Sequence, residues 1–251
     1  MARSPAFFPI VLALGTTILA PLAIARGDGR EEGLTEINQC QTISQPGSYK
    51  LVKNLTGPVN GNANCLVITT SFVTIDLAGF TMTGGNGSGT AILAVPPSSG
   101  SLVGIAVRNG SISVFLNGVD LSSATGSIVE GLRVVGNFSG QPVEPVTGFG
   151  TGINADGIVK GNTASFYTNG IIATGLVVDN LAEHNTQGLE VGADSTVIGN
   201  TVTSSARGGI AVSCPSNVTN NTAVNIFAIT NANLTFSGDG CSNTNNVAPG
   251  D

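Results

Sequence analysis

The chain repeats the pattern of one stretch, Gly152-Ile153-Asn154-Ala155-Asp156-Gly157-Ile158-Val159-Lys160-Gly161-Asn162, three more times toward its C-terminus. Each copy opens with Gly and an aliphatic residue, reaches a Val, and places an Asn three positions after that Val. The successive copies are marked by Asn162, Asn180, Asn200 and Asn221, which are almost evenly spaced. A period of about 20 residues predicts an architecture in which each copy stacks on the next.

Apolar and polar residues alternate within the copies. Val73-Thr74-Ile75-Asp76-Leu77, for example, has the two-residue period of a strand that buries one face. No segment carries a 3.6-residue stripe long enough for a helix. Looser copies at Leu77, Val107 and Val134 precede the four regular ones. The sequence therefore predicts an all-β fold, a β-solenoid of about seven coils.

The repeated Asn are expected to hold the coils together. Equivalent residues of successive coils lie about 4.8 Å apart, so stacked amides can hydrogen-bond from coil to coil. The Asn column should fall at a tight corner, where Asn tolerates a left-handed or bridging backbone. We interpret Asn162, Asn180, Asn200 and Asn221 as a structural ladder rather than as ligand-binding residues.

Four cysteines allow three disulfide pairings. Cys40 and Cys65 lie near the start of the repeats, and Cys214 and Cys241 lie near their end. We predict the sequential pairing, which staples each end of the solenoid locally. Each loop could contribute roughly 3 kcal/mol on the loop-entropy estimate.

Composition excludes several classes of protein. Only 10% of the residues are charged and the formal net charge is −6, so the chain lacks the basic surface that binds nucleic acid. A single His and the absence of a C-x-x-C motif argue against the usual metal and redox sites. We expect no cofactor and no metal.

The N-terminus predicts export. Arg3 precedes an apolar stretch that ends in Ala23-Ile24-Ala25, which is typical of a cleaved signal peptide. A membrane anchor is the alternative, although Gly and Pro interrupt the stretch. We expect a signal peptide at 1–25, a flexible leader at 26–36 and one solenoid domain at 37–251. The mature protein should be secreted, extracellular or periplasmic, with no membrane segment.

The chain resembles a known group of proteins. The resemblance lies in Ile37-Asn38-Gln39-Cys40-Gln41-Thr42-Ile43, in Pro46-Gly47-Ser48-Tyr49, in Cys65-Leu66-Val67-Ile68, and in the segment from Val73 to Gly84. These look like the N-terminal block of secreted bacterial right-handed parallel β-helix proteins of the pectin-lyase-like superfamily, which includes carbohydrate-binding and sugar-hydrolase repeat domains. The resemblance covers about 37–235 and implies a right-handed parallel β-helix.

That resemblance implies a fold more than an activity, because the superfamily spans lyases, hydrolases, epimerases, adhesins and repeat proteins without assigned chemistry. The adjacent Asp pair and Gly-His-Gly motif of its polygalacturonase-like branch are missing from the sequence. The remaining candidates for catalysis are Glu183, His184 and Glu190, with Asp156, Asp179, Asp194 and Arg207 near them by coil register. Two carboxylates on one surface could serve as an acid and a base. The alternative is that they solvate the face of a rod.

The sequence thus favours a non-catalytic surface module or a module that binds polysaccharide or cell-surface glycan. A polysaccharide lyase or glycoside hydrolase with an atypical carboxylate site is the alternative. An ice-binding solenoid ranks last, because the Thr-x-Thr pairs at 81–83 and 201–203 are not continued on the coils between them. Two segments, 84–101 and 139–150, are rich in Gly, Ser or Pro and are predicted to be loops that project between coils.

Overall fold

The computed structural model describes residues 33–58, 63–85, 89–98, 100–137, 150–224, 226 and 233–248. The predicted signal peptide lies outside the described residues, as do most of the predicted leader and residues 139–149 of the second predicted loop. The first strand, β1, begins at Leu34, inside the segment predicted to be leader.

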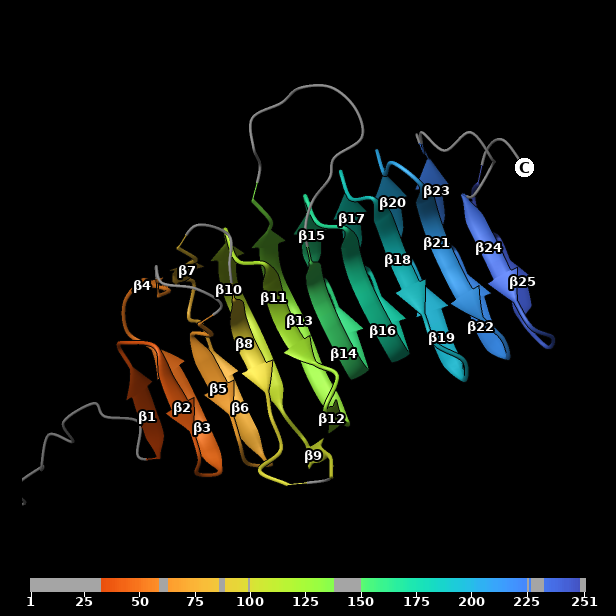
Figure 1. Ribbon diagram of the computed structural model, residues 1–251. Helices are drawn as coiled ribbons and strands as arrows, with labels where there is room; N and C mark the ends of the chain where they lie inside the picture. Colours follow the sequence, from red (N-terminus) through yellow and green to blue (C-terminus); the bar gives the residue numbers. More distant parts are fainter. Residues whose placement is uncertain are drawn as a thin grey trace, which may run out of the picture. The chain divides into compact units, whose positions relative to one another are not determined.

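The unit from Gly33 onward is a parallel β-solenoid of about eight turns, with no helix among the described residues (Figure 1). Successive turns stack strand on strand in three faces. All the strand pairings between turns are parallel. The described residues contain no helix that could cross a membrane.

The first face contains, in stacking order, β1 (Leu34–Ile37), β3 (Gly47–Leu51), β6 (Val73–Asp76), β10 (Ala106–Ser113), β13 (Ser127–Val135), β14 (Thr151–Lys160), β16 (Asn169–Val178), β19 (Ser195–Ile198), β22 (Ser216–Thr219) and β25 (Ser242–Thr244). The second contains β4 (Leu55–Thr56), β7 (Thr81–Thr83), the second halves of β10 and β13, β15 (Thr163–Ser165), β17 (Leu181–Glu183), β20 (Thr201–Thr203) and β23 (Thr222–Val224). The third contains β2 (Gln41–Ile43), β5 (Leu66–Ile68), β8 (Thr90–Ala94), β11 (Asn117–Leu121), the first halves of β14 and β16, β18 (Gln187–Val191), β21 (Gly208–Ser213) and β24 (Leu234–Ser237). A separate short pair joins β9 (Leu102–Val103) to β12 (Ala124–Thr125).

The prediction of a projecting loop at 84–101 is wrong in its middle. Thr90–Ala94 forms β8, a largely buried strand that pairs with β5 and β11 on the third face. The turn that contains β8 was therefore missed, which is part of the difference between seven predicted coils and about eight turns. The short apolar run Ala91-Ile92-Leu93 lies between Gly-rich segments, and these segments hid it.

The core is a stack of inward side chains, one from each strand of each turn. On the first face the inward column is fully or almost fully buried and consists of Tyr49, Ile75, Val107, Val129, Val159, Val177, Val197 and Val218. On the second face the column narrows to Ala or Val in the regular repeats. The Gly that opens each repeat copy also faces this core: a Cβ on Gly188 would collide with the side chain of Val202. Close packing between turns therefore explains why the repeat begins with Gly.

The Asn ladder lies inside the corner between the first and second faces. Its members are almost completely buried. The Asn180 Oδ1 atom accepts hydrogen bonds from the backbone N–H and the Nδ2 of Asn162, both at 3.0 Å. Its Nδ2 donates to the Val159 carbonyl at 2.8 Å and to Asn200 Oδ1 at 2.9 Å. Each amide thus satisfies backbone groups on one neighbouring turn and contacts the next Asn.

The same pattern continues beyond the four predicted positions. Asn200 and Asn221 repeat these contacts, and Asn246 adds a fifth member that accepts from the Asn221 backbone N–H at 2.7 Å. At the other end, the Leu132 backbone N–H donates to Asn162 Oδ1 at 3.0 Å, and Leu132 itself cannot extend the ladder.

The left-handed residue of the corner is not the ladder Asn, contrary to our expectation, but the residue before it. That position has positive φ in turn after turn, at Asn109, Gly131, Gly161, Asp179, Gly199, Asn220 and Asn245. These are Gly, Asn and Asp, the residue types that adopt this conformation at least cost. The ladder Asn is required for its amide, and the residue before it for its backbone.

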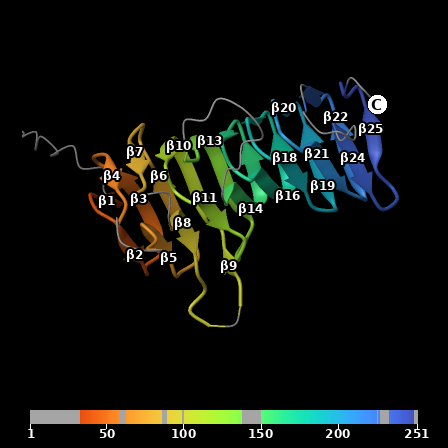
Figure 2. The same ribbon diagram turned by 45° about the horizontal axis from the view of Figure 1, so that its top comes forward.

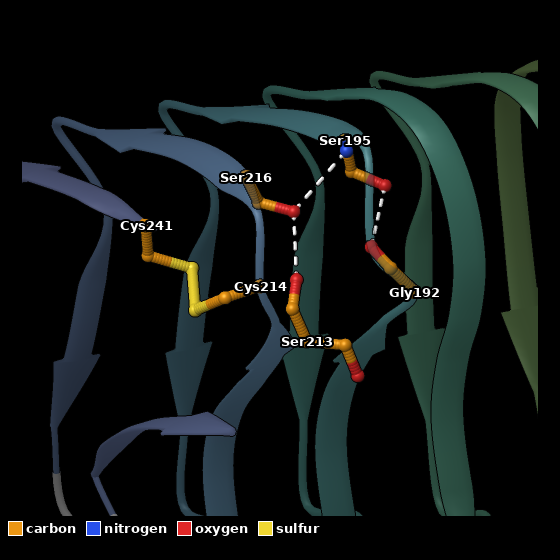
Figure 3. The surroundings of a disulfide bond; sticks show 6 residues. All are labelled: Gly192, Ser195, Ser213, Cys214, Ser216 and Cys241. Carbon is orange, nitrogen blue, oxygen red and sulfur yellow. Dashed lines mark hydrogen bonds between the residues drawn. A yellow bond between two sulfur atoms is a disulfide. The ribbon is translucent and has the colours of Figure 1, made fainter. Parts of the chain in front are cut away.

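A shorter ladder of hydroxyl groups lies at the opposite end of the first face. The Gly175 N–H donates to Ser195 Oγ at 3.0 Å, and the Ser195 N–H donates to Ser216 Oγ at 3.1 Å. Figure 3 shows Ser195 and Ser216 beside the Cys214–Cys241 disulfide. The Cys40–Cys65 disulfide closes the other end, so the predicted local pairing is confirmed.

Asn180→Ala should lower the free energy of unfolding by about 1 to 3 kcal/mol. The substitution removes the partner that the Asn180 side chain provides to the Asn162 N–H and the Val159 carbonyl on the preceding turn, and it removes one donor from Asn200 Oδ1. The measurement is chemical unfolding of the purified protein. Asn154→Ala is the matched control: Asn154 points outward from β14 and its side chain makes no hydrogen bond among the described residues, so the loss should stay within about 0.5 kcal/mol. Equal losses in both variants would contradict the ladder's role.

Candidate functional site

The three predicted catalytic residues lie at or beside the corner between the second and third faces, which we call the second corner. Glu183 ends β17 on the second face and is half-buried, between Ser165 and Thr203 of the neighbouring turns. Glu190 is exposed on β18 of the third face. The two carboxylates therefore belong to different faces, and among the described residues neither takes part in a hydrogen bond or ion pair.

His184 lies at the corner itself. Its backbone has a φ of +53°, and its ring stacks on Phe166 of the preceding turn, with centroids 5.3 Å apart and planes 19° from parallel. Phe166 has positive φ as well, at +63°. Both residues occupy the left-handed position of the second corner. The stacking thus accounts for the orientation of the imidazole ring.

The other polar residues assigned to this region by register are spread over separate positions. Asp179 and Asp194 are exposed and have positive φ, Asp156 is half-buried in β14, and Arg207 is exposed before β21. No group of His, Cys, Asp and Glu suited to holding a metal ion occurs in the part of the chain that the structure describes.

A regular set of charges, which sequence reasoning missed, lies on the outside of the first face. One outward position of six successive strands alternates in sign, and we call this set the charge column: Glu36, Lys50, Asp76, Arg108, Glu130 and Lys160. Arg108 Nε lies 3.3 Å from Asp76 Oδ2. The register continues with the aliphatic Val178 and Ile198.

An exposed aromatic ring was also missed. Phe72 is 67% exposed, precedes β6, and has a φ of +59°. Its backbone is held firmly: its N–H donates to the Val103 carbonyl at 2.9 Å, and its carbonyl accepts from the Gly47 N–H at 3.0 Å. The ring lies against Gly104, where an added Cβ would be 3.2 Å from Phe72 Cδ1. The same corner position has positive φ in neighbouring turns, at Gly104 and Gly126, so Phe72 places an aromatic side chain where those turns have Gly.

Phe72 is hydrogen-bonded to Val103 of β9, the strand that follows the segment projecting between β8 and β9 (Figure 2). Val103, in β9, is 45% exposed, and its N–H donates to Ser71 Oγ at 3.0 Å. Val95, at the start of the projection, is also exposed. We call Phe72 and Val103 the aromatic ridge. It is an apolar surface on a rigid backbone, bordered by Ser and Gly.

Both tyrosines are unavailable for stacking on a ligand. Tyr49 is buried and its hydroxyl donates to the Gln45 carbonyl at 2.8 Å. Tyr167 is buried at the second corner, and its hydroxyl has no hydrogen-bond partner among the described residues. Burial raises the pKa of Tyr167 above its usual value, because the charged phenolate would lose its hydration.

No protein-family model, no curated protein and no solved structure matches this chain. Functional conclusions therefore depend on the chain's own residues.

Tyr167→Phe should leave stability at neutral pH equal or higher, because it removes a buried hydroxyl without a partner. It should also change the response to alkali. The folded pKa of Tyr167 is raised above that of the unfolded chain, so its contribution is complete below about pH 10 and is lost as the pH rises further. The measurement is unfolding free energy against pH from 7 to 11, and the variant should lose less stability above pH 10.

Tyr49→Phe is the control, because it deletes a hydroxyl that has a partner. It should cost about 1 kcal/mol at neutral pH. A Tyr167→Phe variant that is clearly less stable than the wild type would show that its hydroxyl is bonded.

Proposed function

We propose that the protein is an exported, non-catalytic β-solenoid module that binds polysaccharide or cell-surface glycan through the aromatic ridge. The observation that carries this proposal is Phe72, an aromatic ring that is two-thirds exposed on a backbone held at both its N–H and its carbonyl. A ring presented in this way can stack on the apolar face of a sugar. Little conformational freedom is lost on binding, because the backbone is already ordered.

The surroundings of the ridge fit a neutral polymer. Val103 extends the apolar surface, and the hydroxyls of Ser71 and Ser101 lie on the neighbouring segments. The described part of the projection between β8 and β9 adds exposed polar residues such as Ser98 and Ser101. Loops that project from a solenoid are common sites of specific contacts.

Export is supported by the two disulfides, since such bonds persist in oxidising compartments. The apolar N-terminal stretch that ends in Ala23-Ile24-Ala25 supports the same conclusion. We keep the assignment to right-handed parallel β-helix proteins of the pectin-lyase-like superfamily as part of this proposal. It is supported by the parallel stack together with the residues of the N-terminal block.

Phe72→Asn should abolish retention of the protein in gels that contain the polysaccharide it binds, chosen from a panel of neutral and acidic polymers. Asn tolerates positive φ, so the variant should fold with stability within about 1 kcal/mol of the wild type. Phe72→Tyr should retain binding, because the ring remains. Affinity electrophoresis measures retention, and thermal unfolding checks the fold.

Val52→Asn is the control, because Val52 is another exposed apolar residue, located after β3. Retention should be unchanged in this variant. Wild-type binding that survives Phe72→Asn would move recognition away from the ridge. Absence of retention on every polymer of the panel would remove the proposed glycan function.

The same panel tests catalysis. Release of oligosaccharides from any polymer, lost in both Glu183→Gln and Glu190→Gln while both variants stay folded, would establish a lyase or hydrolase and reject the non-catalytic assignment.

A further inference from the structure

The outer surface of the first face carries two neighbouring columns with different chemistry. One is the charge column. The other lies two residues earlier on each strand and becomes aliphatic in the middle of the solenoid, at Ile128, Ile158 and Leu176, which we call the aliphatic column. Ile158 is 36% exposed and Leu176 is 38% exposed. Parallel sheets are usually covered on both faces, so this outer surface is unusual.

Most of the charge column forms no ion pair with any other residue that the structure describes. Arg108 and Asp76 form the one ion pair that joins its members among the described residues. Lys50 and Glu130 are half-exposed, and Glu36 and Lys160 are exposed. The charges at the two ends of the column, Glu36 with Lys50 and Glu130 with Lys160, are therefore available to another surface.

We propose that this surface is an interface with a second copy of the chain, docked with its stacking direction reversed. With the stacking direction reversed, neighbouring column members of opposite charge can face each other across the interface, whereas a two-fold axis along the stacking direction cannot pair them. A two-fold axis parallel to the strands and between the turns of Glu130 and Lys160 places Glu130 opposite Lys160 of the second copy, twice by symmetry.

The aliphatic column obeys the same symmetry. With this axis, Ile128 lies opposite Ile158 of the second copy, again twice, and Leu176 lies opposite Ala106. Four isoleucines then form an apolar centre with opposite charges beside it. This arrangement has the composition of a small interface, with apolar residues surrounded by polar ones.

Docking with the stacking directions of the two solenoids parallel does not pair opposite charges of the charge column. A two-fold axis along the stacking direction brings each turn opposite its own copy. Each member of the charge column then meets either its like charge or the aliphatic column, depending on where the axis passes. Like charges in contact are unfavourable, and this docking pairs none of the column's charges. The reversed docking pairs Glu130 with Lys160 twice and leaves Arg108 and Asp76, which are already ion-paired with each other, opposite Val178 and Ile198.

The test is sedimentation velocity of the purified protein over a range from micromolar to millimolar concentrations. We expect a reversible monomer–dimer equilibrium. Lys160→Glu places Glu opposite Glu130 of the second copy at two symmetric positions, and it should raise the dissociation constant about tenfold or more. Glu130→Lys combined with Lys160→Glu restores opposite charges across the interface and should recover dimerisation. Leu176→Ser should weaken the dimer without reversing any charge.

Lys53→Glu is the matched control, because it makes the same change of net charge at an exposed lysine outside the column. It should leave the dissociation constant within about twofold of the wild type. Circular dichroism checks that each variant is folded. If Lys160→Glu does not fold, the dissociation constant of Leu176→Ser provides the test. A wild-type monomer at all concentrations would overturn the proposal, as would a double variant that stays monomeric or a control as weak as Lys160→Glu.

Discussion

The corner between the first and second faces imposes the constraint on which the rest of the solenoid depends. The backbone must turn sharply there in every coil, and its N–H and C=O groups leave the regular parallel ladder while remaining inside the protein. Buried groups of this kind need partners. In the C-terminal half the Asn ladder supplies them, since Asn180 alone satisfies backbone groups of Asn162 and Val159. The residue before each ladder Asn makes the turn by adopting positive φ.

The requirements for buried packing and for a tight turn do not apply to the outward positions of the strands. Inward positions must be apolar to fill the stack, and the left-handed position before the Asn ladder is Asn, Gly or Asp. Outward side chains such as Ile158 and Lys160 have neither requirement. Chemistry that is not explained by folding therefore concentrates on the outside, in the charge column and at Phe72.

The periodic parts of the molecule were predictable from the sequence. The nearly even spacing of the repeat copies revealed the stack and the ladder positions Asn162 to Asn221, and the sequential cysteines indicated the disulfides. The charge column was not predictable in this way, because insertions of unequal length separate its members along the chain. Asn246 was missed for the same reason, since a longer segment follows Asn221 than follows the other ladder Asn. Phe72 gave no signal, because exposure at a corner depends on the turns on either side.

The two halves of the solenoid keep their register by different forces. The charge column extends from Glu36 to Lys160, whereas the Asn ladder begins at Asn162, on the turn where the charges end. In the N-terminal half the corner is held by backbone bonds such as Gly79 N–H to the Asn109 carbonyl at 2.7 Å, and by Asn54 Oδ1, which accepts from the Thr81 N–H at 2.9 Å.

Surface charges are weakened by salt, but buried amide bonds lie in a low dielectric and are not. If a coil paired with the coil two turns away instead of with its neighbour, column members of like charge would lie side by side. The alternation in sign disfavours that mispairing. Among the described members of the column, the Arg108–Asp76 ion pair favours the observed register in this way, beside the backbone bonds between turns of the N-terminal half. The buried amides specify it in the C-terminal half, and that leaves the outer surface beyond Lys160 to aliphatic side chains such as Val178 and Ile198.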